Sequence, residues 1–165
     1  MPNYRRPHVA GGTYFITQVT YQRQPWLCRD VARHALRTAI SQVRHKRPFH
    51  LDAFVLLPDH FHCLMTLPPD DSDISTLLRL IKTYVTRHYG TELEAAVETS
   101  TSRMKRRERA LWQRRFWDHV IRDDRDYTNH CRYVHDNPVK HHLCKTPTDW
   151  RFSSVHRFMA EGRYP

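Results

Sequence analysis

The stretch Phe54-Val55-Leu56-Leu57-Pro58-Asp59-His60-Phe61-His62-Cys63-Leu64-Met65 is typical of two β-strands joined by a tight turn. Strand-forming residues precede the turn signal Pro58-Asp59, and an extended pattern resumes at His60. Successive side chains of a strand face opposite sides, so His60 and His62 point the same way and Phe61 points away. The stretch therefore predicts a hairpin that displays two histidines on one face.

Two imidazoles that are held side by side can bind a divalent metal ion. A His-x-His pair on a strand is nevertheless more often packed or solvated than a metal site. The pair alone is compatible with both interpretations, and other features of the sequence are needed to distinguish them.

Length and composition limit the classes of protein to which the chain can belong. At 165 residues, the chain predicts one domain, residues 1–165, with a single core. Lys and Arg (27) exceed Asp and Glu (17), which gives a formal net charge of +10, and aromatic residues make up 12%. This composition favours nucleic acid as a partner, although a positive surface by itself indicates only attraction for polyanions.

Cysteine use and hydropathy indicate a cytoplasmic protein without a membrane partner. The four cysteines are scattered without a C-x-x-C pair, which argues against a zinc ribbon and fits reduced thiols. The N-terminal residues lack an apolar signal core, and no apolar run approaches the ~20 residues that cross a bilayer.

Hydrophobic periodicity predicts alternating strands and helices. Expected strands cover residues 13–21, 49–57, 60–67 and 116–121, and expected helices cover residues 31–43, 74–89, 125–137 and 155–160. Gly90 and Pro138 are the expected stops of two helices. This order predicts an α+β fold, ferredoxin-like or RNA-recognition-like, whose antiparallel sheet has its helices packed on one face.

Basic segments mark a candidate DNA surface. Residues 1–10 form a basic arm in which arginines and a tyrosine could grip phosphates and stack on a base, or simply be solvated. Residues 92–110 predict an exposed insertion with a basic end. The candidate DNA-contacting residues are Asn3, Tyr4, Arg5, Arg6, Arg79, Lys82, Arg114, Arg115 and Lys140.

A second candidate group lies on the helix predicted near the C-terminus. Tyr133 and Asn137 are separated by four residues, so they share one helix face. With a metal bound by His60 and His62, the Tyr133 phenol could attack a phosphodiester and form a covalent phosphotyrosine. Free tyrosine is mostly protonated at neutral pH. A nearby cation or base is therefore needed, and Lys140 and His135 are the local candidates.

The chain resembles the single-tyrosine transposase superfamily with a His-hydrophobe-His motif and, within it, the REP-associated tyrosine transposases of bacteria. The resemblance extends along nearly the whole chain, and the ordered combination of motifs is much more specific than any one of them. The matching segments are residues 3–6, 11–15, 57–62, 80–82, 115–119, 133–141 and 150–154, which include Leu57-Pro58-Asp59-His60-Phe61-His62 and Tyr133-Val134-His135-Asp136-Asn137-Pro138.

The resemblance implies a function and roles for particular residues. The histidine pair of the family falls on His60 and His62, its nucleophile on Tyr133, and the polar residue that completes the metal site on Asn137. Members cut single-stranded DNA near hairpins of repetitive extragenic palindromes (REP), leaving a 5′-phosphotyrosine and a free 3′-hydroxyl. They read a short guide sequence partly with the N-terminal arm, here Asn3 to Arg6.

The expected cofactor is Mg²⁺ or Mn²⁺. Mg²⁺ prefers oxygen ligands, so two imidazoles and one amide oxygen favour Mn²⁺.

Some relatives continue past the position of Pro165 into a tail, and residues 92–110 look longer than in compact relatives. The expected state is monomer or homodimer, because the superfamily includes dimers with shared sites.

Two other interpretations stay open from the sequence. A non-catalytic RNA-recognition-like module would use basic and aromatic residues for stacking and would not need His60, His62 and Tyr133 to converge. A zinc-dependent hydrolase or zinc-stabilised fold would need a further ligand, such as Cys63 or His135. Strand alternation sends Cys63 to the face opposite His62, which disfavours that cysteine.

Overall fold

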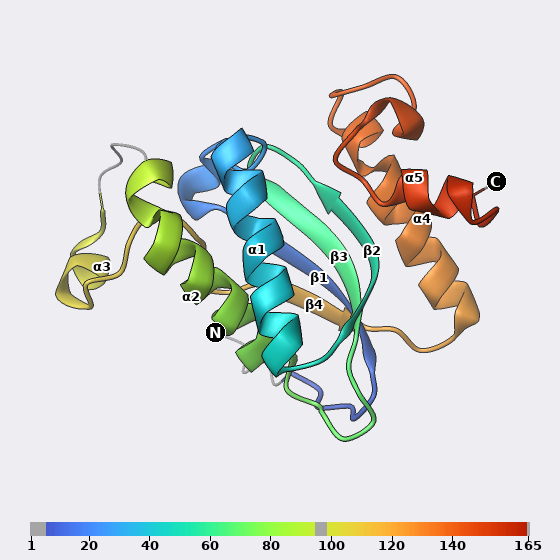
Figure 1. Cartoon of the computed structure of the whole chain (residues 1–165), viewed down its shortest axis with the longest axis horizontal. Helices are drawn as coiled ribbons and strands as arrows, with labels where there is room; N and C mark the ends of the chain where they lie inside the picture. The colour runs from blue at the N-terminus through green and yellow to red at the C-terminus, as the bar shows by residue number, and fades with distance from the viewer. Residues whose placement is uncertain (1–5, 95–98, 165) are drawn as a thin grey trace.

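A four-stranded antiparallel sheet in the order β2-β3-β1-β4 forms the centre of the computed structural model, which describes residues 6–94 and 99–164 (Figure 1). The strands are β1 (Thr13–Val19), β2 (His50–Leu56), β3 (His60–Thr66) and β4 (Trp117–Val120). The helices are α1 (Asp30–Lys46), α2 (Ile74–Leu93), α3 (Thr101–Lys105), α4 (Asp124–Lys140) and α5 (Val155–Ala160), with short 3-10 turns η1 (Tyr21–Arg23) and η2 (Pro147–Asp149). The predicted α+β class and the ferredoxin-like strand order are confirmed.

The predicted hairpin is formed by β2 and β3. The Leu57 amide donates to the His60 carbonyl across the turn at 2.9 Å. β3 also pairs with β1, which places Thr17 opposite His62 and Val19 opposite His60. Because β3 lies inside the sheet with a layer on either side, every residue from His60 to Met65 is buried.

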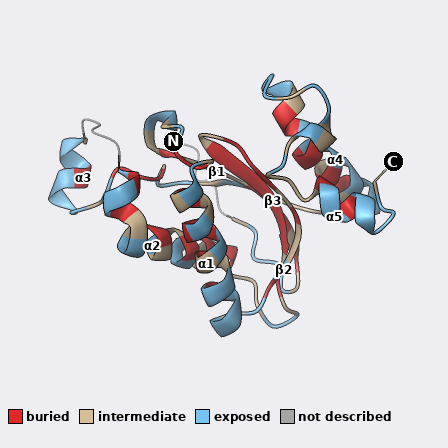
Figure 2. Cartoon of the chain, turned by 45° about the horizontal axis from the view of Figure 1, so that its top comes forward, coloured by how far each residue is buried: buried red, intermediate tan, exposed pale blue. Residues whose placement is uncertain are grey.

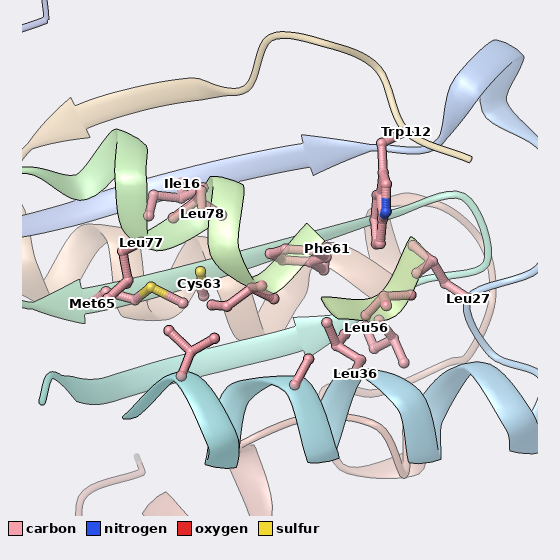
Figure 3. Close-up of a cluster of buried hydrophobic side chains, with 14 of the residues drawn as sticks. Ile16, Leu27, Leu36, Leu56, Phe61, Cys63, Met65, Leu77, Leu78 and Trp112 are labelled. Atoms are coloured by element: carbon pink, nitrogen blue, oxygen red, sulfur yellow. The ribbon is translucent and has the colours of Figure 1, made fainter. Parts of the chain in front are cut away.

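The first face of the sheet packs against α1 and α2 (Figure 3). Phe61, Cys63 and Met65 of β3 point to this side, and Ile16 of β1 joins them. The helices contribute Leu36 from α1 and Leu77, Leu78 and Ile81 from α2. Burial of these side chains supplies most of the apolar driving force for folding.

The second face of the sheet packs against α4 and α5, and here the sequence prediction is wrong (Figure 2). The prediction of helices on a single face holds for α1 and α2. α4 and α5 cover the opposite face through Val134 and Phe158. The physical reason is that central strands carry side chains toward both faces, so their alternation does not tell which helix covers which side. This placement brings α4 over the side chains of His60 and His62.

Two predicted helix stops are also corrected. α2 continues past Gly90 to Leu93. A Cβ at Gly90 would lie 2.7 Å from Arg109 Cδ, so this glycine permits the close approach of a later segment and does not end the helix. α4 continues through Pro138 to Lys140. A proline in the last turn removes only one helical hydrogen bond, and the His141 amide still donates to the Asn137 carbonyl at 3.0 Å.

The predicted insertion, residues 92–110, is tied down in the parts that the structure describes. Arg103 of α3 is 6% exposed, donates to the Trp112 carbonyl at 2.7 Å and lies over the ring of Tyr21 at 4.3 Å. Residues 95–98 lie outside the described range. Within residues 6–94 and 99–164, no helix has the length and apolar character needed to span a membrane.

Candidate active site

A groove of about 650 Å³ opens on the second face of the sheet, between β1, β3 and α4. His60 and His62 form its floor, and Tyr133 and His141 stand on its α4 side. Trp117, 56% exposed at the start of β4, borders it as well. The groove therefore combines the predicted histidine pair with the predicted nucleophile.

Both histidines are oriented by hydrogen bonds through Nδ1. His60 Nδ1 lies 2.6 Å from Asp59 Oδ1, and His62 Nδ1 lies 2.7 Å from Thr17 Oγ1. The turn places Asp59 next to His60, and the β1–β3 register places Thr17 opposite His62. Because Nδ1 is engaged in each ring, Nε2 is the nitrogen available to bind a metal ion.

Burial keeps His62 neutral. Desolvation, followed by the repulsion of His60 and His141, lowers the pKa of His62 to about 3, although the neighbouring Asn137 amide acts in the opposite direction. Burial and His60 likewise lower the pKa of His141. A neutral imidazole has a free lone pair, so these shifts suit metal coordination.

Tyr133 stands directly above this pair. Its ring centroid is 5.3 Å from that of His62 with the planes at 75°, and 5.6 Å from that of Phe15. Lys140 Nζ lies 4.3 Å from the centre of the Tyr133 ring. Tyr133 is 38% exposed, so its side chain is accessible from solvent.

Asn137 offers an oxygen that fits a metal ligand. Its side chain is 1% exposed, and its Oδ1 accepts no hydrogen bond of normal geometry from any residue that the structure describes, although it lies beside the His62 ring and would favour the charged form of that ring. A buried carbonyl oxygen without a partner loses its hydration and gains nothing in return. Two imidazole Nε2 atoms and this oxygen form a donor set that a divalent cation would satisfy.

His141 was not predicted as part of the site. Its ring centroid lies 5.0 Å from that of His60. The expected helix stop at Pro138 hid it, because His141 continues the helix face of Tyr133 and Asn137 by one more turn. Helical spacing carried through the proline would have found this residue.

The zinc interpretation loses both of its suggested ligands. Cys63 is fully buried in the cluster under α1 and α2, on the far side of the sheet from His62. His135 faces away from the groove, where its Nε2 lies 2.9 Å from Ser154 Oγ and its ring contacts Phe158. Neither residue joins His60 and His62, and His135 is not placed to act on Tyr133.

The predicted DNA-contacting residues that the structure describes are spread over more than one surface. Asn3, Tyr4 and Arg5 lie outside the described residues. Arg6 Nε donates to Asp118 Oδ1 at 2.8 Å, and its guanidinium lies 3.9 Å from the centre of the Phe116 ring. Arg115 is exposed at the surface.

Arg79, Lys82 and Arg114 line a separate groove of about 620 Å³. Lys82 Nζ donates to Gln18 Oε1 and to the carbonyls of Gln113 and Arg114 at 3.0–3.3 Å. Burial lowers the pKa of Lys82 to about 8. Its three N–H groups are thus used within the protein, so Lys82 anchors the segment that precedes β4.

A second cluster of possible metal ligands escaped the sequence analysis. One ligand atom from each of His119, Asp126 and His130 lies within 4.8 Å of the other two. Asp126 and His130 are separated by four residues on α4, a spacing that could have signalled the pair. His119 comes from β4, and only the fold brings it to them.

The comparison with known proteins defines the class first. Residues 8–137 match the family described as IS200-like transposases, and the chain belongs to this family. Within it, the chain belongs with the REP-associated tyrosine transposases. It is 39% identical over 165 residues to the REP-associated tyrosine transposase of Escherichia coli (strain K12), covering 100% of this chain and 89% of that protein.

Two further matches agree. A Haemophilus influenzae protein, provisionally given the same name, is 40% identical to this chain over 165 residues. The match covers 100% of this chain and 92% of that protein. A solved structure of a REP-associated tyrosine transposase bound to a REP hairpin superposes with a TM-score of 0.83 at 39% identity, covering 100% of this chain and 89% of that one. The chain is thus a member of a family of DNA-processing enzymes.

Proposed function

We propose that this chain cuts and rejoins single-stranded DNA beside REP-type hairpins through a 5′-phosphotyrosine on Tyr133, with the help of a divalent metal ion. The observation that carries the proposal is the 5.3 Å between the ring centroids of Tyr133 and His62 within one chain. A non-catalytic binding module has no need for this convergence, so the arrangement favours the enzyme.

Tyr133 is the proposed nucleophile. Its Oη forms a bond to phosphorus while the bond between phosphorus and the 3′ oxygen breaks. The phenolic proton leaves to water, and the departing 3′ oxygen takes a proton to become a hydroxyl. Lys140, 4.3 Å from the ring centre, is placed to attract the negatively charged phosphodiester toward the phenol. Reversal of the same step by another 3′-hydroxyl rejoins the strand.

His60, His62 and Asn137 are the proposed metal ligands, through two Nε2 atoms and one Oδ1. A divalent ion held there would polarise the phosphodiester and stabilise the charge that develops on it. The donor set favours Mn²⁺ over Mg²⁺ because imidazole suits softer ions. Asp59 and Thr17 hold the two rings in the orientation that this set requires.

The proposed partner is single-stranded DNA that carries a hairpin, as the related solved structure suggests. Trp117, exposed at the edge of the groove, is available to stack on an unpaired base. Arg6 is held beside it by Asp118 and Phe116. This position supports a role of Arg6 in reading a guide sequence, while residues 3–5 lie outside the described residues. Because one chain supplies both halves of the site, a monomer suffices for cleavage.

The test is formation of a covalent adduct. Incubation with a hairpin-bearing single strand and Mn²⁺ should give a protein–DNA band that resists denaturation. Tyr133→Phe removes the attacking oxygen and should abolish this band while weakening DNA binding by about 10-fold at most, since one hydroxyl contributes on the order of 0.5–1.5 kcal/mol to a contact.

Two controls sharpen the result. Tyr89→Phe, on α2 at the far side of the sheet, should form the adduct normally. Removal of divalent ions with a chelator should stop the reaction, and added Mn²⁺ should restore it. Persistence of the adduct in Tyr133→Phe would refute the assignment of the nucleophile.

A further inference from the structure

The His119–Asp126–His130 cluster lies beside the proposed active site and has no role in the proposed chemistry. His119 Nε2 is 2.8 Å from Asp126 Oδ2. His130 Nδ1 is 3.1 Å from Asp126 Oδ1 and 2.8 Å from the backbone carbonyl oxygen of Asp126. The two imidazole rings stack with centroids 4.7 Å apart and planes inclined by 16°. All three side chains are partly exposed, which leaves the cluster open to an ion from solvent.

We propose that His119, Asp126 and His130 form a second metal site that binds Zn²⁺ through His119 Nε2, an Asp126 carboxylate oxygen and His130 Nδ1, with water as the fourth ligand. This site is separate from His60, His62 and Asn137. Its ligands come from β4 and α4, so the bound ion would fasten the edge strand to the helix that carries Tyr133.

The donor set and its spacing fit zinc. Two imidazoles and one carboxylate with an open position make a common zinc environment. Around a tetrahedral ion with bonds of ~2.0–2.1 Å, ligand atoms lie ~3.3 Å apart. The two histidine–aspartate distances, 2.8 and 3.1 Å, already lie near that spacing. Rotation of the rings, which for His130 means that Nδ1 leaves the Asp126 backbone carbonyl at 2.8 Å, would therefore admit the ion.

The charges around the cluster are compatible with a cation. Burial acts against ionisation of Asp126, but hydrogen bonds from His119 and Arg122 lower its pKa to about 2, so the carboxylate is charged at neutral pH. The Arg122 backbone amide donates to Asp126 Oδ2 at 3.0 Å and can stay there, because each carboxylate oxygen has two lone pairs. The Arg122 side chain is 76% exposed and is free to turn away from the ion.

A short aromatic chain links this cluster to the active site. The His130 ring lies 4.8 Å from Phe15 between centroids, and Phe15 in turn contacts His62 at 5.5 Å and Tyr133 at 5.6 Å. An ion that fixed His130 would therefore restrict Phe15, which packs against both halves of the site. The zinc would act on the position of Tyr133 rather than on the DNA.

The test is zinc binding by a full-length chain in which the first site is removed. His60→Ala/His62→Ala should still take up one Zn²⁺ per chain, measured by competition with a chromophoric chelator. Adding His119→Gln or, separately, His130→Gln should weaken this uptake by ~100-fold or more, since each change removes a direct ligand. Co²⁺ in place of Zn²⁺ should give the visible absorption of a tetrahedral nitrogen–oxygen site.

Controls make the outcome decisive. His45→Gln, an exposed histidine on α1, should leave uptake in the same background unchanged. Circular dichroism checks that each variant is folded. Because His119 and His130 lie on different elements, the second variant still tests the site if the first does not fold. The proposal is wrong if the His60→Ala/His62→Ala chain binds no zinc, or if binding survives both glutamine variants. In either case the three side chains would only form hydrogen bonds and would not form a zinc site.

Discussion

The two faces of the sheet differ in the kind of side chain that they bury. The face under α1 and α2 buries aliphatic and aromatic groups such as Ile16, Phe61 and Leu77. The face under α4 buries His60, His62 and Asn137 beside a smaller apolar cluster. Polar groups without full hydrogen bonding destabilise a fold, whereas apolar burial stabilises it.

The difference teaches that stability and chemistry are divided between opposite sides of one strand. β3 sends Phe61 and Cys63 into the first face and His60 and His62 into the second. The apolar face holds the strand rigid, and this rigidity keeps two imidazoles in register for a ligand. Substitutions on the apolar face should therefore mainly lower the free energy of unfolding. Substitutions on the face that carries the histidines should mainly lower adduct formation.

The largest stability effect is expected on the apolar face. Leu77→Ala removes a fully buried side chain of α2 and should lower the free energy of unfolding by about 3 kcal/mol, measured by urea denaturation. Leu80→Ala, three residues along the same helix and 36% exposed, should cost less than about 0.5 kcal/mol. Equal losses in the two variants would contradict the assignment of the core. Adduct formation by the folded Leu77→Ala protein should be normal.

The next effect is expected behind His60. Asp59→Asn weakens the hydrogen bond at 2.6 Å that orients the ring, and it should raise the Mn²⁺ concentration for half-maximal adduct formation by about 10–100-fold. Arg23→Ala, which removes only the exposed partner of Asp59, is the control and should change this concentration by less than about 3-fold. If Asp59→Asn needs no more Mn²⁺ than the original chain, Asp59 does not support a metal ligand.

The sequence predicted one face of the sheet better than the other. Strand and helix periodicity identified β1 to β4 and the apolar stripe of α2, because these depend on local alternation. Helical spacing paired Tyr133 with Asn137, and the family resemblance gave the two residues their expected roles. The position of α4 was missed because a central strand buries side chains on both faces, so its alternation does not tell which helix covers which face. His141 was missed because the helix was expected to stop at Pro138. His119 and the anchoring role of Lys82 were missed because they depend on contacts between distant segments.

A smaller effect is expected from His135 of α4, which is buried against Phe158 of α5, away from the site. Burial, followed by the charges of Arg157 and Arg163, lowers its pKa from 6.5 to about 4. The unfolded chain then binds more protons than the folded one between these values, so stability is complete above pH 6.5 and falls as the pH drops toward 4. His135 should contribute up to ~1.4 kcal/mol per pH unit in this window. Urea denaturation of His135→Gln should give a shallower dependence by about this amount, and an unchanged slope would exclude His135 as its source.

The smallest effect, and the sharpest comparison of the two faces, is expected at Asn137. Asn137→Leu replaces a buried oxygen that lacks a hydrogen-bond partner among the described residues, so the free energy of unfolding without metal should rise by about 1 kcal/mol. The same change removes a proposed ligand, so adduct formation at limiting Mn²⁺ should fall by about 10-fold or more. Asn129→Leu, exposed on the same helix, should give no gain in stability. A variant that is both more stable and less active would mean that Asn137 is kept for a ligand; a loss of stability would mean instead that Oδ1 already has a partner in solution.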